Sequence, residues 1–479
     1  MWWQDAVIYQ VYPRSFQDSD GDGVGDLRGI EQRLDHLAWL GVDALWLSPI
    51  YPSPMHDMGY DVADYKDVDP VFGTLEDFDS LLSSARERGL RVLLDLVPCH
   101  TSIEHPWFGE HPGWYIWRDE PNNWISAFGG SAWTRLNGRY YLHSFYPEQP
   151  DLDWRNPEVV AAMQDVLRFW IHRGAAGYRV DAIDRLLKDP ELRDDPPSDG
   201  EAFGLPLSDA EAKLALTNSR NAPDTDRALA SIREAVGDHL LVGEVYLPSA
   251  KWQPYLEHLD RAFAFELLHA PWDAERLRAA IAATSSRPGA AWVLSNHDFG
   301  RLVTRFGPEN ARSAALLLLT LPGPAFLYQG DEIGLGDGPG GERVYDRAGR
   351  DRYRHPMQWD GSRSGGFTTG EPWLPPVDPE RTNVEAQRDD AGSMLSLVRN
   401  LVTLRRSLGD GLDLLDADAG VLAYRRGEHA IAINTTAEAR PAPLAGDTVF
   451  ETRPGALRGG DLAAHSGAVA TGLPASKRG

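Results

Sequence analysis

The sequence predicts an α/β protein: a parallel (β/α)8 TIM barrel with a domain inserted after the third strand and a C-terminal antiparallel β domain. Three observations favour this fold class. Short apolar runs typical of buried strands alternate with amphipathic segments about eight times. A stretch rich in Trp, Pro, Gly and Asn interrupts the alternation after the third strand. Short alternating runs at 421–424 and 430–433 follow the last helix.

We expect the barrel to comprise 1–100 and 166–408, the inserted domain 101–165, and a C-terminal β-sandwich domain 409–479. The expected barrel strands, in order, are 6–12, 43–48, 91–96, 177–181, 239–245, 262–265, 291–294 and 325–328. The expected helices are 29–40, 74–88, 157–172, 227–236, 311–319 and 393–407, with Thr74 and Asn156 as N-caps. A polar, Pro-rich segment, 189–224, reads as a surface excursion.

Composition excludes several classes of function. The net charge of −24 disfavours nucleic acid or an anionic membrane as a partner and is compatible with a neutral substrate. Cys99 is the only cysteine, which excludes an intramolecular disulfide. No run of about 18 apolar residues predicts a membrane span. Met1 is not followed by the basic and apolar regions of a signal peptide, so we expect a cytoplasmic protein, either a monomer or a homodimer.

The loop between the first strand and the first helix resembles a calcium-binding loop. Carboxylates alternate with glycines in Asp18-Ser19-Asp20-Gly21-Asp22-Gly23-Val24-Gly25-Asp26, which gathers hard oxygen ligands around one point. A solvated acidic turn is the alternative. We expect a structural Ca²⁺ or Mg²⁺ bound by Asp18, Asp20, Asp22 and Asp26, with the backbone carbonyl of Val24 as a further ligand.

The fourth strand delivers Arg179 and Asp181 at its C-terminal end. Side chains two residues apart in a strand point the same way, so the guanidinium should lower the pKa of the carboxyl and keep it ionised. Taken alone, such a pair is usually a structural salt bridge. Other strand ends carry reactive side chains as well: His100, Glu244, His297 and Asp298. In a (β/α)8 barrel these ends converge on one pocket.

The residue types at the strand ends suit cleavage of a glycosidic bond, which uses paired carboxylates. The sequence contains no GxGxxG or P-loop motif and no His-Glu-x-x-His zinc motif. The two histidines suit hydrogen bonding to sugar hydroxyls, although core histidines satisfied by backbone groups would need no such role.

Several ordered motifs resemble those of the α-amylase superfamily of glycoside hydrolases. They are GVDALWLSP at 41–49, DLVPCHTS at 95–102, GYRVD at 177–181, GEVY at 243–246 and SNHD at 295–298. Two more, QPDLDW at 149–154 and RDRYRHPMQW at 350–359, resemble the branch that contains oligo-1,6-glucosidases, α-glucosidases and sucrose-active relatives. The resemblance runs from Trp2 to about Trp359.

This resemblance implies roles for individual residues. Asp181 would be the nucleophile that forms a covalent glycosyl-enzyme, Glu244 the general acid and then the base, and Asp298 the stabiliser of the oxocarbenium-like transition state. In a retaining enzyme, the nucleophile and the acid lie roughly 5–5.5 Å apart. Arg179 would keep Asp181 ionised, while His100 and His297 would bind hydroxyls of the glucose.

The resemblance also implies a closed glucose site. Asp57 and Tyr60 lie where this branch binds and stacks the non-reducing terminal glucose, and Phe145 resembles an aromatic wall of the same subsite. An arginine paired with Asp57 would close the end of the pocket. Arg350 is preferred, with Arg354 as the alternative. Because a closed pocket admits one terminal glucose, cleavage would be exo.

Two departures from the family pattern carry information. Cys99 replaces an asparagine that helps amylases hold a calcium ion near the inserted domain, so we expect no metal there. Ala182 follows the nucleophile, where relatives that prefer α-1,6 bonds often carry valine. A small residue there favours α-1,4 or sucrose-type substrates.

The resemblance therefore predicts an exo-acting retaining α-glucosidase on short α-glucosides. The nearest alternative is a transglucosylase or isomerase of the sucrose isomerase or trehalose synthase type, which would share the covalent intermediate. An alternative of another class is a non-catalytic, transporter-associated homologue. Such homologues typically lose catalytic carboxylates and carry a membrane anchor.

Overall fold

The computed structural model describes residues 1–198, 213–286, 289–341 and 343–472. Part of the expected surface excursion, 199–212, lies outside the described residues. So does the end of the expected C-terminal domain, 473–479.

Eight parallel strands form a closed barrel, in the order β1-β2-β3-β7-β8-β9-β10-β11 around its circumference, which confirms the predicted fold class. Each strand lies next to the one that follows it within the barrel, and β11 pairs with β1 to close the ring. The strands are β1 Val7–Val11, β2 Ala44–Leu47, β3 Arg91–Leu96, β7 Gly177–Val180, β8 Leu240–Gly243, β9 Arg261–Phe263, β10 Ala290–Val293 and β11 Ala325–Tyr328. Their near-continuous burial explains why they read as apolar runs, because helices cover the outside of the barrel and side chains fill its interior.

The connections between barrel strands are helical. The helices are α1 Leu27–Gln32, α2 Leu34–Leu40, α3 Leu75–Glu87, α5 Pro157–Arg173, α6 Thr225–Val236, α7 Gln253–Leu256, α8 Phe265–His269, α9 Ala274–Ser285, α10 Leu302–Phe306 and α11 Ala311–Thr320, followed after the last strand by α12 Val384–Arg388 and α13 Met394–Arg405. The two predicted N-caps are confirmed. The Thr74 hydroxyl forms a capping box with Asp77, and the Asn156 side chain accepts from the backbone N–H of Glu158.

The single helix predicted for 29–40 is wrong, because the structure contains α1 and α2 in its place. Arg33 lies between them with φ −102 and ψ 3, outside the helical region, and its backbone N–H bonds to the carbonyls of Ile30 and Glu31. The Arg33 side chain reaches back to Gln17 and over the ring of Trp359. The apolar spacing continues across this turn, which is why periodicity alone does not reveal the break.

The insertion follows β3 and contains helix α4, Pro106–Glu110, and a three-stranded antiparallel sheet in the order β4-β6-β5. These strands are β4 Trp117–Arg118, β5 Trp133–Leu136 and β6 Arg139–Leu142. The boundary expected at residue 165 falls inside α5, which starts at Pro157 and leads back to barrel strand β7.

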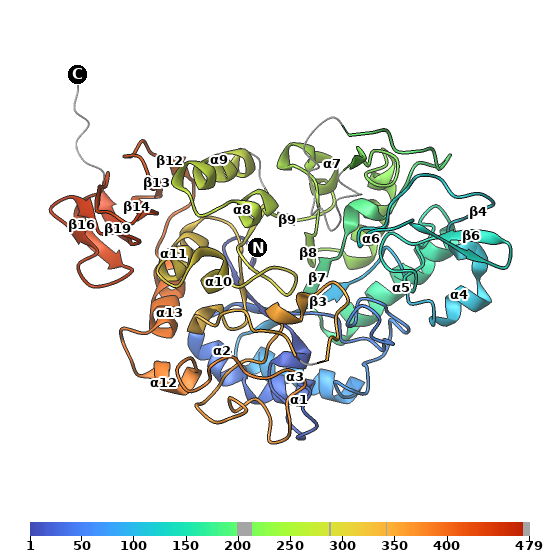
Figure 1. Ribbon diagram of the computed structural model, residues 1–479, viewed down its shortest axis with the longest axis horizontal. Coiled ribbons are helices and arrows are strands. Elements are labelled where there is room, and N and C mark those ends of the chain that lie inside the picture. The colour runs from blue at the N-terminus through green and yellow to red at the C-terminus, as the bar shows by residue number, and fades with distance from the viewer. Residues whose placement is uncertain (199–212, 287–288, 342, 473–479) are drawn as a thin grey trace.

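The C-terminal part is built from antiparallel sheets. A five-stranded sheet has the order β12-β13-β14-β19-β16, from β12 Asp413–Leu414, β13 Val421–Arg426, β14 His429–Asn434, β19 Gly467–Gly472 and β16 Ala445–Glu451. A three-stranded sheet pairs β15 Arg440–Pro441, β18 Asp461–Leu462 and β17 Leu457–Arg458. In Figure 1 the five-stranded sheet lies on one side of the barrel, and β4 and β6 of the insertion lie on the other. None of the described helices is both long and apolar enough to cross a membrane.

One carboxylate joins the barrel to the C-terminal sheet. Asp5, just before β1, accepts from Arg405 of α13 at 2.8 Å and from Arg426 of β13 at 2.5 Å. Both guanidinium groups are about 1% exposed and also donate to backbone carbonyls of 319–323. The ion pairs therefore fix the last helix and the C-terminal sheet against the start of the chain.

We expect Asp5→Asn to lower the free energy of unfolding by about 3 kcal/mol, because it leaves two buried guanidinium groups without a counterion. Chemical denaturation measures the loss. Asp413→Asn is the matched control, since it removes the partner of Arg425 in an exposed pair and should cost less than about 1 kcal/mol. Equal losses in the two variants would show that Asp5 does not join the domains in this way.

Candidate functional site

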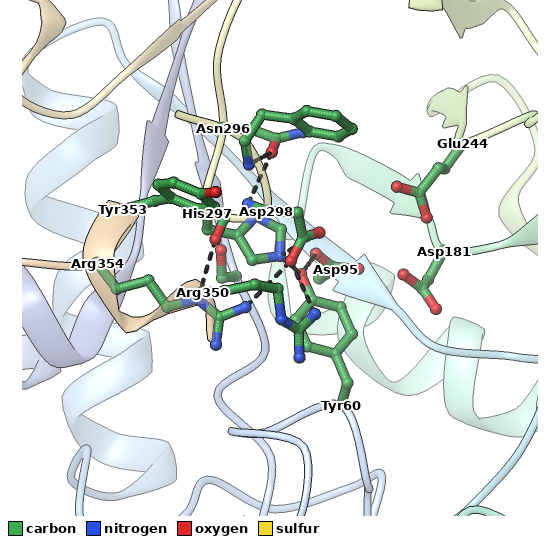
Figure 2. A network of polar contacts seen from close by, with 12 residues as sticks. Tyr60, Asp95, Asp181, Glu244, Asn296, His297, Asp298, Arg350, Tyr353 and Arg354 are labelled. Carbon is green, nitrogen blue, oxygen red and sulfur yellow. Dashed lines mark hydrogen bonds and ion pairs between the residues drawn. The ribbon is translucent and has the colours of Figure 1, made fainter. Parts of the chain in front are cut away.

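Strand register places the two central carboxylates next to each other. In the pairing of β7 with β8, Val180 lies opposite Gly243, so the residues that follow, Asp181 and Glu244, leave adjacent strand ends together. The backbone N–H of Glu244 donates to the carbonyl of Val180 at 2.8 Å and maintains this alignment beyond the last paired residues. Asp181 and Glu244 face one another in Figure 2.

The strand ends surround a cavity of about 220 Å³. Eight of the ten predicted catalytic and substrate-binding side chains line it: Asp57, Tyr60, His100, Phe145, Asp181, Glu244, Asp298 and Arg350. The other two, Arg179 and His297, lie behind the wall and contact lining carboxylates. The structure thus brings all ten into one cluster.

Arg179 links three carboxylates from three strands. Its Nη1 donates to Asp181 at 2.6 Å and to Asp95 at 2.8 Å, and its Nη2 lies 2.7 Å from Glu244. Register explains the contact with Asp95, which lies directly opposite Arg179 in the pairing of β3 with β7. One buried cation therefore fixes the orientation of both reacting groups.

Burial raises the pKa values of Asp181 and Glu244 to different extents. It raises the pKa of Glu244 to about 8, although the charge of Arg179 acts to lower it. It raises the pKa of Asp181 to about 6, against the same guanidinium. Arg179 acts to lower the pKa of Asp181, as expected, but desolvation outweighs the ion pair, so the pKa is raised overall. The order still suits an ionised Asp181 beside a protonated Glu244 near neutral pH.

Asp298 lies in the loop that follows β10, in a more cationic environment. Arg350 and Arg354 donate to its Oδ1 at 2.9 and 3.0 Å, and His297 Nε2 lies 3.2 Å from its Oδ2 (Figure 2). Burial acts to raise the pKa of Asp298, but the adjacent His297 ring and the guanidinium groups of Arg350 and Arg354 outweigh it and hold the pKa well below its usual range. Asp298 is consequently a permanent negative charge on the wall of the cavity.

An ion pair between Arg350 and Asp57 lies in the wall of the cavity. Arg350 Nη2 donates to Asp57 at 2.5 Å and to Asp346 at 2.7 Å. Arg350 is thus the arginine that contacts Asp57, whereas Arg354 turns to the carbonyl of His297 and to Asp298. Asp57 also accepts from Gln149 at 2.9 Å.

The two histidines are held by protein groups. His297 is fully buried, its Nδ1 lies 2.8 Å from Gln10 Nε2, its Nε2 lies 2.7 Å from the Tyr60 hydroxyl, and its ring stacks on that of Tyr60 at 5.3 Å. Burial lowers the pKa of His297 to about 3, so the ring is neutral. His100 Nε2 lies 3.0 Å from the carbonyl of Tyr60, and its ring lies against that of Phe145.

Several residues at the cavity were not predicted from the sequence. Phe128, Tyr246, Ala348 and Tyr353 also line the cavity, and Asp95 and Asp346 hold its arginines. For Asp95 a signal was present, because it lies in an inward-facing position of a predicted strand. Phe128 and Ala348 lie in loops without a periodic pattern, so only the fold brings them to the cavity.

A lysine supplies positive charge near Cys99. Lys188 Nζ lies 2.5 Å from Asp151 and 3.6 Å from Cys99 Sγ, and all three side chains are buried. Cys99, His100 and Asp151 have ligand atoms close enough to hold a metal ion, but the Lys188 ammonium already neutralises Asp151. Burial raises the pKa of the Cys99 thiol to about 12, which keeps it protonated and a poor ligand.

The acidic loop brings part of the predicted metal set together. Oxygens of Asp18, Asp20 and Asp22 lie within 4.8 Å of one another. Asp26 is not in this group. It caps α1 by accepting from the backbone N–H of Gly29, and its other oxygen accepts from that of Ser19. Asp18 accepts from the backbone N–H groups of Asp20, Gly21 and Gly23, so the loop is also ordered by its own hydrogen bonds.

The cavity holds two carboxyl groups, one suited to be ionised and one to be protonated. Such a pair can cleave a glycosidic bond, because the ionised group can attack the sugar carbon while the protonated group gives its proton to the departing oxygen. A comparison with protein families matches residues 10–411 to the catalytic domain of alpha amylase. The chain belongs to the α-amylase family. It is therefore a glycoside hydrolase, and its relatives place it in the branch of α-glucosidases and oligo-1,6-glucosidases.

Two curated relatives and one solved structure illustrate the similarity. The chain is 39% identical to the alpha-glucosidase of Apis mellifera, covering 84% of this chain and 78% of that protein. It is 37% identical to the oligo-1,6-glucosidase of Parageobacillus thermoglucosidasius, covering 85% of this chain and 84% of that one. The crystal structure of the alpha-glucosyl transfer enzyme XgtA matches with a TM-score of 0.93 and 37% identity, covering 98% of this chain and 99% of that one.

Proposed function

We propose that this α-amylase family member is an exo-acting, retaining α-glucosidase that releases glucose from the non-reducing end of short α-glucosides. The observation that carries the proposal is the shared cavity of Asp181 and Glu244, about 220 Å³ in volume, whose wall contains the ion pair of Asp57 and Arg350. A chain end fits such a pocket, whereas the interior of a polysaccharide does not. The three carboxylates meet in one cavity, which disfavours a non-catalytic homologue.

The proposed reaction uses two displacements. Asp181 attacks the anomeric carbon while Glu244 gives its proton to the departing oxygen, which forms a covalent glucosyl-enzyme. Glu244, now ionised, then takes a proton from water, which attacks the same carbon and releases glucose. The negative charge of Asp298 stabilises the positive charge that develops on the sugar ring in both steps.

The surroundings of the nucleophile support a preference for α-1,4 over α-1,6 bonds. Ala182 is buried and adopts φ 39, and its backbone N–H donates to Glu244 Oε2 at 3.0 Å. A β-branched residue is costly in this left-handed conformation, and it would also narrow the space beside the acid. The small side chain leaves room for the sugar that departs.

The charges of the cavity disfavour a phosphorylated substrate. Among the described residues that line it, Arg350 supplies the one guanidinium or ammonium group, and Asp57, Asp298 and Asp346 already neutralise that group. A phosphate would meet Asp181, Asp298 and Asp57 without a free cation. Neutral glucosides such as maltose or sucrose fit the site better.

Transglucosylation or isomerisation is the second candidate. The similarity to the alpha-glucosyl transfer enzyme XgtA over nearly the whole chain supports it. Both activities share the glucosyl-enzyme and differ in whether water or a sugar hydroxyl intercepts it.

The deciding experiment compares kcat/KM on maltose, isomaltose, sucrose, trehalose and longer malto-oligosaccharides and identifies the products. The proposal expects free glucose of α configuration, with maltose preferred over isomaltose. New disaccharides as the main products would favour the second candidate. No release of glucose from any of these substrates would exclude both.

We also propose that the acidic loop holds a structural Ca²⁺ or Mg²⁺ through Asp18, Asp20 and Asp22, with the Val24 carbonyl and Asp26 as further ligands. Clustered carboxylates are the ligands that these hard cations prefer. The loop contacts the segment after the barrel, since Thr368 donates to Asp18 and the Trp373 N–H donates to the Gly23 carbonyl. A bound cation would tie these two segments together.

If the loop binds a cation, removal of metal by EDTA should lower the melting temperature by several degrees, and Ca²⁺ should restore it. Binding stabilises the folded state because the unfolded chain does not gather the ligands. The double variant Asp20→Asn/Asp22→Asn should melt at the EDTA value with or without Ca²⁺. An equal response of the variant and the wild type to Ca²⁺ would place the cation elsewhere.

A further inference from the structure

We infer that Tyr246 is a positioning residue for Glu244: its hydroxyl fixes which carboxyl oxygen carries the catalytic proton. The inference rests on the proposed function, because it assumes that Glu244 is the general acid and base. Tyr246 belongs neither to the paired carboxylates nor to the glucose-binding set, and it follows the acid by two residues.

The geometry ties Tyr246 to Glu244 directly. The Tyr246 hydroxyl donates to Glu244 Oε1 at 2.7 Å. Its ring stacks on Phe265, with centroids 4.6 Å apart and an interplanar angle of 18°. Its backbone N–H donates to Asp184 Oδ1 at 3.2 Å. The stacking on Phe265 therefore holds the ring and the Asp184 bond fixes the backbone, so that the hydroxyl is already placed to donate to Glu244.

The donors around Glu244 are distributed unequally between its two oxygens. Oε1 receives the Tyr246 hydroxyl and Arg179 Nη2, both at 2.7 Å. Oε2 receives the backbone N–H of Ala182 at 3.0 Å. A proton on Oε1 would point at two groups that themselves donate hydrogens, and these three hydrogens would repel one another. The proton of the neutral carboxyl group therefore resides on Oε2.

This arrangement defines the first proton transfer. Glu244 Oε2 gives its proton to the glycosidic oxygen, and the bond between that oxygen and the anomeric carbon breaks. The departing sugar keeps the electron pair of that bond, while an oxygen of Asp181 bonds to the carbon. Without the Tyr246 hydroxyl, Glu244 can rotate and the proton can occupy either oxygen, which lowers the fraction of molecules ready to react.

Tyr246 also affects the titration of Glu244. A hydroxyl that donates to a carboxylate favours the ionised form, so Tyr246 partly offsets the effect of burial on the pKa of Glu244. The other charged groups that interact with Glu244 include Arg179, Asp181, Asp298 and Asp95. Tyr246→Phe leaves these in place and removes one donor, so the pKa of Glu244 should rise.

The test is the kinetics of Tyr246→Phe on substrates with different leaving groups. Maltose needs protonation of its departing oxygen, whereas 2,4-dinitrophenyl α-glucoside does not. We expect kcat/KM to fall about tenfold for maltose and less than about threefold for the dinitrophenyl substrate. The basic limb of kcat/KM against pH for maltose should move to higher pH.

Two reference variants make the kinetics of Tyr246→Phe interpretable. Glu244→Gln shows the full dependence on leaving group when the proton is absent. Tyr255→Phe removes a buried tyrosine hydroxyl that donates to Asn221 at 2.8 Å outside the cavity, and it should change neither the substrate ratio nor the pH profile.

Equal losses on both substrates with an unchanged pH profile, or no loss on either, would overturn the role of Tyr246. The proposed function would still stand in those cases, because the wild type would remain an active α-glucosidase. A wild type inactive on every α-glucoside would overturn the proposed function and this inference with it.

Discussion

Replacing Asp181 with asparagine should lower kcat/KM on nitrophenyl α-glucoside roughly 10⁴- to 10⁶-fold, because the amide cannot form the glucosyl-enzyme. Asp181 contacts Arg179 at 2.6 Å and lines the cavity beside Glu244. The nearly isosteric change keeps these contacts possible and removes the charge and the nucleophile. The loss should therefore appear in the chemical step, with little change in melting temperature.

A matched control is Asp189→Asn, which makes the same change in another carboxylate paired with an arginine. Asp189 is buried and accepts from Arg193 at 2.6 Å, but it does not line the cavity. Its replacement should leave the kinetics unchanged. If Asp181→Asn retained wild-type activity, the covalent mechanism would be wrong.

Mass spectrometry gives an independent test of the same role. A fluorinated glucosyl fluoride that slows the second step should attach one glucosyl group to the wild type, and the labelled peptide should contain Asp181. An adduct on Glu244 or Asp298 would reassign the nucleophile.

The barrel and the clustering of the carboxylates at its strand ends were predictable from sequence because both follow from local patterns. Each strand is a short buried run; Asp181 and Glu244 follow two of them directly, and Asp298 lies in the loop after a third, which ends at Val293. Parallel strands in a barrel bring such ends together whatever lies between them. Hence Asp181 and Glu244 could be paired without knowledge of the long segment that separates them.

Features that depend on register or on loops were not predictable. The contact of Asp95 with Arg179 requires that these residues lie opposite each other in β3 and β7. The capping role of Asp26 requires that α1 begins at Leu27, two residues before the predicted start of the helix. The pKa of Asp181 depends on the burial of the whole cluster, which a single arginine nearby does not reveal.

Glu244→Gln tests the second reacting group. It should lower kcat/KM for maltose by roughly 10²- to 10⁴-fold and spare activated aryl glucosides, whose leaving groups need no proton. The pH profile should change as well. In the wild type, activity requires an ionised Asp181, whose pKa is about 6, and a protonated Glu244, whose pKa is about 8. Activity should therefore fall below about pH 6 and above about pH 8, and in the variant only the acidic limb should remain.

Azide distinguishes the two carboxyl groups by the stereochemistry of the product. In Glu244→Gln the glucosyl-enzyme still forms, and azide can replace water without a base, so the product is an α-glucosyl azide. In Asp181→Ala no glucosyl-enzyme forms, and azide enters the space left by the missing carboxylate, so the product is a β-glucosyl azide. Only a nucleophile at 181 and an acid at 244, on adjacent strand ends of one cavity, predict this pair of opposite outcomes. The same anomer from both variants would mean that the roles are wrongly assigned.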